Sequence, residues 1–99
     1  MRRIFLSLGF VKKPVLEVMY DISKAQEMIT PHYKDKSIEF IHNYDYTATN
    51  KIECLGEAIK NMSSCDIVYF INDWSDHDEC IVQKKVCELY NIEHKIINV

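Results

Sequence analysis

The segment Asp66-Ile67-Val68-Tyr69-Phe70-Ile71 decides the fold of this chain. After its first residue the segment is apolar without alternation, which is typical of a strand in a parallel sheet with both faces covered. Asn72 and Asp73 end the apolar run. We therefore predict a central buried strand here, with helices packed on either face of the sheet.

Helical spacing of apolar residues appears in the three segments 15–29, 52–62 and 81–90. Pro14 suits the first helical position of the first segment, because its missing N–H group has no helical partner there. Asn91 follows the third segment and is expected to form a left-handed cap. Short apolar or β-branched runs predict further strands, at residues 4–8, 37–42 and 94–99.

The predicted order β-α-β-α-β-α-β indicates an α/β fold of the flavodoxin-like or Rossmann-like type, with three layers and right-handed crossovers. We expect a four-stranded parallel sheet in the order 2-1-3-4. Open sheets of this kind bind ligands beyond the carboxyl ends of their strands, where the strand order reverses. The expected site therefore comprises Ser7–Phe10, Asn72–Trp74 and the mouth of the long loop around Asn43–Tyr46.

Composition restricts the class of protein. A chain of 99 residues that is 47% apolar, with two glycines and two prolines, fits one domain spanning residues 1–99. A net charge of -3 without a long basic cluster disfavours nucleic-acid binding. The first apolar stretch is too short for a signal peptide, and no segment is long enough to span a membrane. The four cysteines contain no Cys-x-x-Cys pair, which predicts reduced thiols in a cytoplasmic protein.

Two polar segments deserve comparison as ligand sites. The loop Leu8–Lys13 leads into a helix, so an anion with Lys12 or Lys13 as counter-charge is conceivable, but a tight turn with solvated lysines is the favoured interpretation. The run Asp73–Glu79 holds four carboxylates and an imidazole, yet it matches no calcium loop, and acidic residues are common at helix starts. We predict no metal site and no cofactor.

Three side chains of this region could serve a ligand. Trp74 follows the central strand, where an indole could stack on a planar base or belong to the core. Glu79 and Gln83 lie four residues apart on one helix face. A carboxylate can act as nucleophile or acid/base, whereas an amide can only hydrogen-bond. The histidines have no serine or cysteine at an informative spacing and give no sign of a catalytic triad.

The chain resembles the nucleoside 2-deoxyribosyltransferase-like family, especially its short bacterial and phage members. The resemblance covers nearly the whole chain and depends on the order and spacing of its segments. These are Ile4–Leu8, Leu55-Gly56-Glu57-Ala58-Ile59 through Met62, Cys65–Phe70, Asp73-Trp74, and Cys80 through Tyr90-Asn91-Ile92-Glu93.

The resemblance implies a flavodoxin-like domain that cleaves the N-glycosidic bond of a 2-deoxynucleoside or its monophosphate through a glutamate nucleophile. It also implies a homodimer or larger oligomer, in which a neighbouring subunit completes the active site. Carried over by position, Asp66 is the acidic strand start, Asp73 and Trp74 stand at the pocket edge, and Gln83 stands where the nucleophile should be. Glu79 replaces a small residue of the family.

Two departures from the family affect the reaction. The amide of Gln83 cannot form a glycosyl ester, because that step needs an attacking carboxylate oxygen. Phe10, in a first loop that contains Gly9 but no proline, would narrow a sugar pocket. We therefore expect a nucleoside- or nucleotide-binding domain with impaired glycosyl transfer.

Two alternatives remain open at this point. One is an active N-glycosidic-bond-cleaving enzyme that uses Glu79 as its nucleophile. The other is a protein-interaction module of phage or mobile-element origin, in which Phe10 and Trp74 fill the old cleft. Its partner surface would combine the aromatic residues of Tyr44-Asp45-Tyr46 with the acidic edge Asp76–Glu79.

Overall fold

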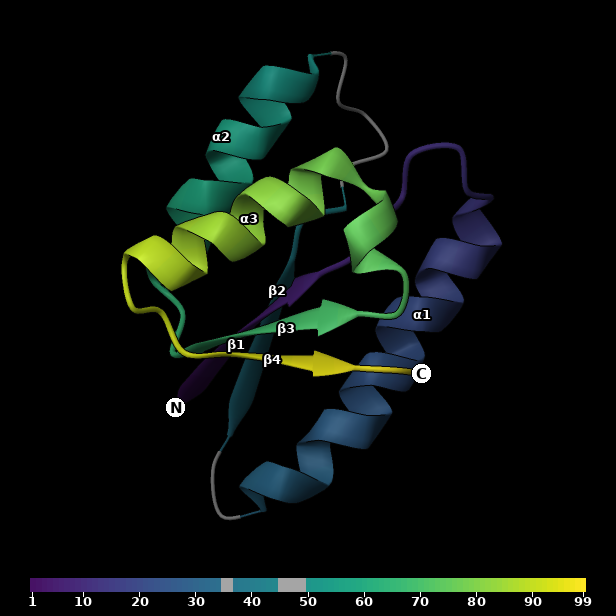
Figure 1. Ribbon diagram of the computed structural model, residues 1–99. Helices are drawn as coiled ribbons and strands as arrows, with labels where there is room; N and C mark the ends of the chain where they lie inside the picture. The colour runs from purple at the N-terminus through teal and green to yellow at the C-terminus, as the bar shows by residue number, and fades with distance from the viewer. Residues whose placement is uncertain (35–36, 45–49) are drawn as a thin grey trace.

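The computed structural model describes residues 1–34, 37–44 and 50–99 (Figure 1). Within these residues the chain forms an α/β fold with a four-stranded, all-parallel sheet in the order β2-β1-β3-β4, as predicted. The strands are β1 (Arg2–Ser7), β2 (Ile38–His42), β3 (Ile67–Ile71) and β4 (His94–Ile97). The helices are α1 (Val15–Ile29), α2 (Lys51–Met62) and α3 (Asp78–Leu89), with short 3₁₀ helices η1 (Thr30–Tyr33) and η2 (Trp74–Asp76).

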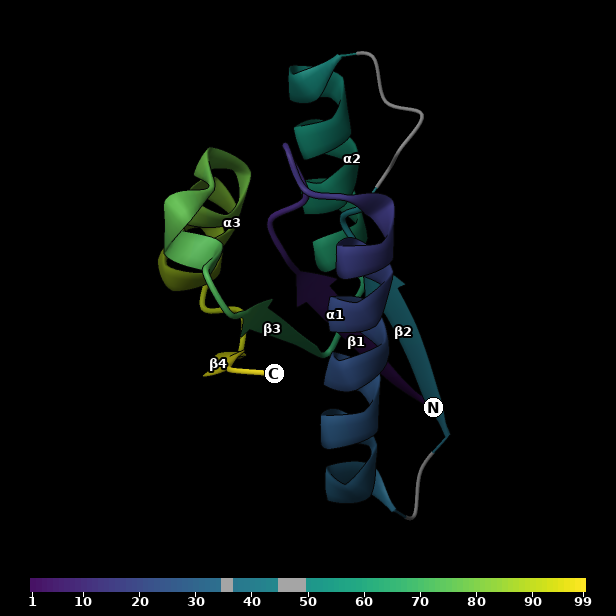
Figure 2. The same cartoon turned by 90° about the vertical axis from the view of Figure 1, so that its right-hand side faces the viewer.

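The sheet separates two apolar layers. Ile4 and Leu6 of β1 pack with the buried residues of α1, whereas Phe5 of the same strand packs with Ala58 and Met62 of α2. This alternation follows from the two-residue period of a strand. Figure 2 accordingly places α1 and α3 on opposite sides of β3. The central strand prediction is confirmed, because every residue of β3 is buried.

The parallel pairing of β1 with β3 fixes the centre of the sheet. Phe5 is the register partner of Val68, and Ser7 is the partner of Phe70. Just before β3, the Asp66 carboxylate accepts a hydrogen bond of 2.8 Å from the backbone N–H of Arg3. The acidic residue at the strand start thus binds the backbone of the neighbouring strand and helps to set this register.

The ends of the helices follow local chemistry. Asn50 caps α2, since its side chain accepts from the backbone N–H groups of Ile52 and Glu53. Asn91 has a φ of 56°, which confirms the predicted left-handed residue after α3. Pro14 is the N-cap of α1 rather than its first helical residue, because its ψ of 144° is extended.

The structure differs from the sequence prediction in two further places. The chain continues beyond α1 as η1, where the Thr30 hydroxyl donates to the Gln26 carbonyl. The segment Trp74–Asp76 forms η2 instead of a simple loop, and α3 begins at Asp78, earlier than the predicted helical segment 81–90. In the described part of the chain, no helix has both the length and the apolar character needed to cross a bilayer.

A matched pair of leucine truncations tests this layered core. Leu6 has no exposed surface, and Leu16 on α1 is 83% exposed. We expect Leu6→Ala to lower the free energy of unfolding by about 2–5 kcal/mol, because it leaves a cavity between β1 and α1. Leu16→Ala should change it by less than about 0.5 kcal/mol. Urea unfolding measures both, and equal losses would contradict the assignment of faces.

Candidate functional site

A pocket of about 600 Å³ opens beyond the carboxyl end of β1, on the face of the sheet that carries α2 and α3. The sequence predicted a site at this end of the strands. The lining comes from the β1–α1 loop (Phe10, Val11, Lys12), the residue after β2 (Asn43), α2 (Lys51, Ile52, Cys54, Leu55, Ala58), and η2 with the start of α3 (Asp76, His77, Asp78, Glu79, Val82, Gln83).

Gln83 is the most buried polar side chain of the pocket lining, with 1% of its surface exposed. The hydroxyl of Ser7, the last residue of β1, donates a hydrogen bond of 2.6 Å to the Gln83 Oε1 atom. Ser7 is itself fully buried. The structure therefore brings together two residues predicted for the site, and it fixes the side-chain amide of Gln83 through its carbonyl oxygen.

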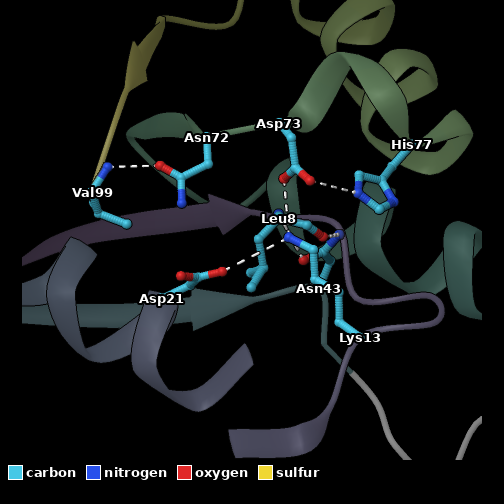
Figure 3. Close-up of polar contacts among 8 residues, drawn as sticks. All are labelled: Leu8, Lys13, Asp21, Asn43, Asn72, Asp73, His77 and Val99. Atoms are coloured by element: carbon cyan, nitrogen blue, oxygen red, sulfur yellow. Dashed lines mark hydrogen bonds and ion pairs between the residues drawn. The ribbon is translucent and has the colours of Figure 1, made fainter. Parts of the chain in front are cut away.

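Asn43 connects β2 with the loop after β1 (Figure 3). Its side-chain oxygen accepts from the backbone N–H of Leu8 at 3.1 Å, and its side-chain nitrogen donates to the Leu8 carbonyl at 3.0 Å. This side chain satisfies both backbone groups of a buried residue that lies beyond the end of the strand. The predicted loop mouth thus contains a structural clamp at Asn43. Asp45 and Tyr46 of the same prediction lie outside the described residues.

Four charged or titratable side chains form a polar clasp beside the pocket: Lys13, Asp21, Asp73 and His77 (Figure 3). The Lys13 Nζ atom lies 3.0 Å from Asp73 Oδ1 and 3.8 Å from Asp21 Oδ2, and the His77 Nε2 atom lies 3.4 Å from Asp73 Oδ2. The clasp joins the β1–α1 loop to α1 and to the segment that leads into α3. Lys13 is thereby committed to protein carboxylates, whereas Lys12 lines the pocket.

The clasp sets the pKa values of its two carboxyl groups in opposite directions. Burial would raise the pKa of Asp73, but hydrogen bonds from Lys13 and His77 outweigh burial and hold it below its ordinary value. Burial raises the pKa of Asp21, and the positive charge of Lys13 only partly offsets this. Asp73, a residue predicted for the pocket edge, thus serves as the acceptor at the centre of the clasp.

Gly9 has a steric role. Its Cα atom lies against the imidazole of His77, and a Cβ atom at residue 9 would overlap that ring. The glycine therefore lets His77 sit between the first loop and the start of α3, where the ring also lines the pocket. Gly9 was predicted to bind a ligand, and the structure shows it contacting a pocket residue.

Phe10 and Glu79 both line the pocket, as their predicted roles require. The Phe10 ring meets the Tyr44 ring edge-on, with centroids 5.3 Å apart, so Tyr44 is partly buried. Among the described residues, the Oε1 atom of Glu79 is buried and has no hydrogen-bond partner. An acceptor in this state is unfavourable by about 1–3 kcal/mol until a donor reaches it. Glu79 thus lines the pocket, and one of its carboxylate oxygens has no hydrogen-bond partner among the described residues.

Asn72 and Trp74 lie outside the pocket lining. The Asn72 side chain accepts a hydrogen bond of 2.7 Å from the backbone N–H of Val99, in a left-handed residue with φ 51°. The Trp74 ring packs on Phe70 with centroids 5.6 Å apart, and the Lys84 ammonium lies over it at 5.3 Å. The turn η2 directs the indole toward the sheet, so Trp74 does not fill the pocket.

Cys80 lies buried beneath the pocket, in contact range of the Ser7 and Asn43 side chains. Burial raises the pKa of the Cys80 thiol to about 11, and the polar side chains of Ser7 and Asn43 nearby offset this only in part. The group therefore stays protonated at neutral pH and offers no thiolate nucleophile. Within the described ranges, no three His, Cys, Asp or Glu side chains are grouped to hold a metal ion.

The pocket wall on α2 was missed by sequence analysis. Leu55 and Ala58 follow helical spacing and were interpreted as core residues, but they also face the pocket, together with the exposed Ile52. The apolar face of α2 therefore contributes both to the core and to the pocket wall. The one available signal was Ile52 itself, an apolar residue in the first turn beside the long loop.

Comparison with known proteins adds no assignment. No family model matches the chain, and no curated protein matches it.

The contact between Gly9 and His77 can be tested by a double-mutant cycle. We expect Gly9→Ala to cost about 1–3 kcal/mol of unfolding free energy, because the added methyl group displaces the ring. The cost should shrink in a His77→Ala background. Gly56→Ala is the control: nothing lies within 4 Å of its new Cβ atom in α2, and helix propensity predicts a gain of about 0.5–1 kcal/mol. An unchanged cost of Gly9→Ala without the ring would contradict the steric account.

Proposed function

We propose that this protein is a nucleoside- or nucleotide-binding domain in which glycosyl transfer is impaired. The observation that carries the proposal is the pocket beyond the carboxyl ends of the strands, where the strand order reverses. In its lining, Ser7 holds the buried Gln83 amide. The position agrees with the general binding edge of open α/β sheets. The residue that the family resemblance places at the nucleophile position is therefore in the pocket, but as an amide.

The pocket suits a ligand of nucleoside size. Its volume of about 600 Å³ falls in the range of small-molecule sites, which bind through apolar and aromatic walls with a few placed polar groups. Phe10, Leu55 and Val82 supply apolar surface, whereas Glu79 and Gln83 supply hydrogen-bonding groups. A planar base with a polar edge matches such a wall.

Two lysines of the lining, which also holds the carboxylates of Asp76, Asp78 and Glu79, would bind a phosphate group as a second part of the ligand. Lys12 and Lys51 reach the pocket from the β1–α1 loop and from the first turn of α2. Lys12 has a φ of 66°, a left-handed conformation that is uncommon for a side chain of this kind. Such strained residues cluster at functional sites, which supports a ligand role for Lys12.

Blocking the pocket tests the binding function directly. Val82 lines the pocket and is 40% exposed, and its neighbour Ile81 is 43% exposed but lies outside the lining. In calorimetric titration with deoxynucleosides and their 5′-monophosphates, we expect binding by the wild type and by Ile81→Trp, and none by Val82→Trp. The indole of the second variant would occupy the ligand volume. No heat and no thermal stabilisation of the wild type across the panel would overturn the proposal.

A second candidate function is N-glycosidic bond cleavage by Glu79. The observation in its favour is the Glu79 carboxylate, which lines the pocket with one oxygen buried and unpartnered. In this reaction the carboxylate would attack the anomeric carbon and form a glycosyl ester, while the base leaves with the bonding electron pair and takes up a proton. Water or a second base would then displace the ester.

Base release from deoxynucleosides decides between the two candidates. The binding proposal predicts no release above the uncatalysed rate in the wild type, measured by chromatography. If release is found, Glu79→Ala should abolish it, because no other carboxylate would remain at that position of the helix. Asp78→Ala serves as the control, since Asp78 lines the same pocket from the preceding residue. Release that persists in Glu79→Ala would remove Glu79 from the mechanism.

A further inference from the structure

We infer that Glu79 and Gln83 read the edge of a guanine base, with the Gln83 amide donating to the base carbonyl and the Glu79 carboxylate accepting from its N–H groups. The inference rests on the proposed binding function and specifies its ligand. It starts from two polar side chains of the pocket lining whose hydrogen-bonding capacity is incompletely used within the described residues.

The hydrogen bond from Ser7 determines which atoms of the Gln83 amide are available to a ligand. A glutamine amide has one carbonyl acceptor and one NH₂ donor group. The Ser7 hydroxyl donates to the carbonyl at 2.6 Å, and both side chains are buried, so the carbonyl is already engaged. The NH₂ group has no partner among the described residues and belongs to a side chain of the pocket lining. Residue 83 thus presents a donor, with Ser7 as the positioning residue.

Glu79 provides the complementary acceptor. It precedes Gln83 by four residues in α3, so the two side chains are neighbours on one helix face. An ionised carboxylate only accepts hydrogen bonds, and its two oxygens can take two donors side by side. Its Oε1 atom is buried without a partner within the described residues, which leaves this acceptor unsatisfied. The pair therefore combines one donor with a carboxylate whose Oε1 atom has no partner among the described residues.

Among the common bases, guanine matches this pattern most fully. Its Watson–Crick edge has one carbonyl acceptor followed by two N–H donors, one on the ring and one exocyclic. Adenine offers a single donor beside one ring acceptor, and hypoxanthine lacks the second donor. Uracil and thymine flank their one N–H group with carbonyl oxygens, and one of these would oppose the carboxylate. Reading of a base by its Watson–Crick edge is common where bases sit in protein pockets.

This arrangement places the base, and not the sugar, against Glu79 and Gln83. The anomeric carbon is then directed away from the carboxylate, so the inference is incompatible with a nucleophilic Glu79. It also makes residues 7, 79 and 83 determinants of base specificity rather than of reaction rate.

Three nucleosides on the wild-type protein provide the first test. We expect calorimetry to give guanosine an affinity about tenfold or more above that of inosine and adenosine, because a bidentate pair discriminates on this scale. If the three nucleosides bind equally, the inference is overturned and the binding function stands. If none binds, the binding function itself fails.

Two matched variants locate the discrimination. Glu79→Gln should weaken guanosine binding about 10- to 100-fold, since an amide cannot accept both donors. Glu88→Gln makes the same substitution on the same helix outside the pocket lining and should retain the guanosine preference. Ser7→Ala frees the Gln83 carbonyl to turn toward the ligand and should reduce the ratio of guanosine to adenosine affinity. A guanosine preference that survives Glu79→Gln would contradict the assignment.

Discussion

The pairing of two buried parallel strands, β1 and β3, is the constraint on which the rest of the structure depends. Since the strands are parallel, each connection must return from the carboxyl end of one strand to the amino end of the next, and the helices of these connections cover both faces of the sheet. The chain leaves β1 toward α1 on one face and approaches β3 from α2 on the other. A pocket forms beyond the carboxyl ends of the strands, between the β1–α1 loop, α2 and the start of α3. Ser7, the last residue of β1, reaches α3 there and holds Gln83.

The fold was predictable because it depends on patterns that survive in a single sequence. The unbroken apolar run of β3 is buried on both faces only in a sheet covered by helices on both sides. The predicted strand order and the left-handed conformation of Asn91 are also confirmed. The site was predictable in part. Phe10, Glu79 and Gln83 line the pocket, but the other predicted site residues lie outside its lining: Ser7, Gly9, Asn72, Asp73 and Trp74. Asn72 binds the backbone of Val99, and η2 directs the Trp74 indole onto Phe70. A three-residue 3₁₀ turn leaves no periodic signal, and the rotation that it imposes on Trp74 cannot be derived from spacing.

The polar side chains in and around the pocket fall into two groups: those bonded to other protein groups and those left for a ligand. Lys13, Asp21, Asp73 and His77 satisfy one another in the clasp, and Asn43 satisfies the backbone of Leu8. Within the described residues, the Oε1 atom of Glu79 is buried without a hydrogen-bond partner, and the hydrogen bond of the Gln83 amide is the one that its oxygen accepts from Ser7; both residues line the pocket. Sequence alone could not make this distinction, since Asp73 and Glu79 are both acidic residues near the start of one helix. Their different partners follow from the three-dimensional path of the β1–α1 loop.

The most direct test of a ligand-binding Gln83 is nuclear magnetic resonance of the ¹⁵N-labelled protein during titration with guanosine. The account predicts that the side-chain NH₂ signals of Gln83 shift with saturation, together with backbone amides of residues 9–12 and 77–83. Amides of β4 and of η1, which lie outside the pocket lining, should stay in place. Saturable shifts confined to those distant elements, with the Gln83 signals unchanged, would contradict the account.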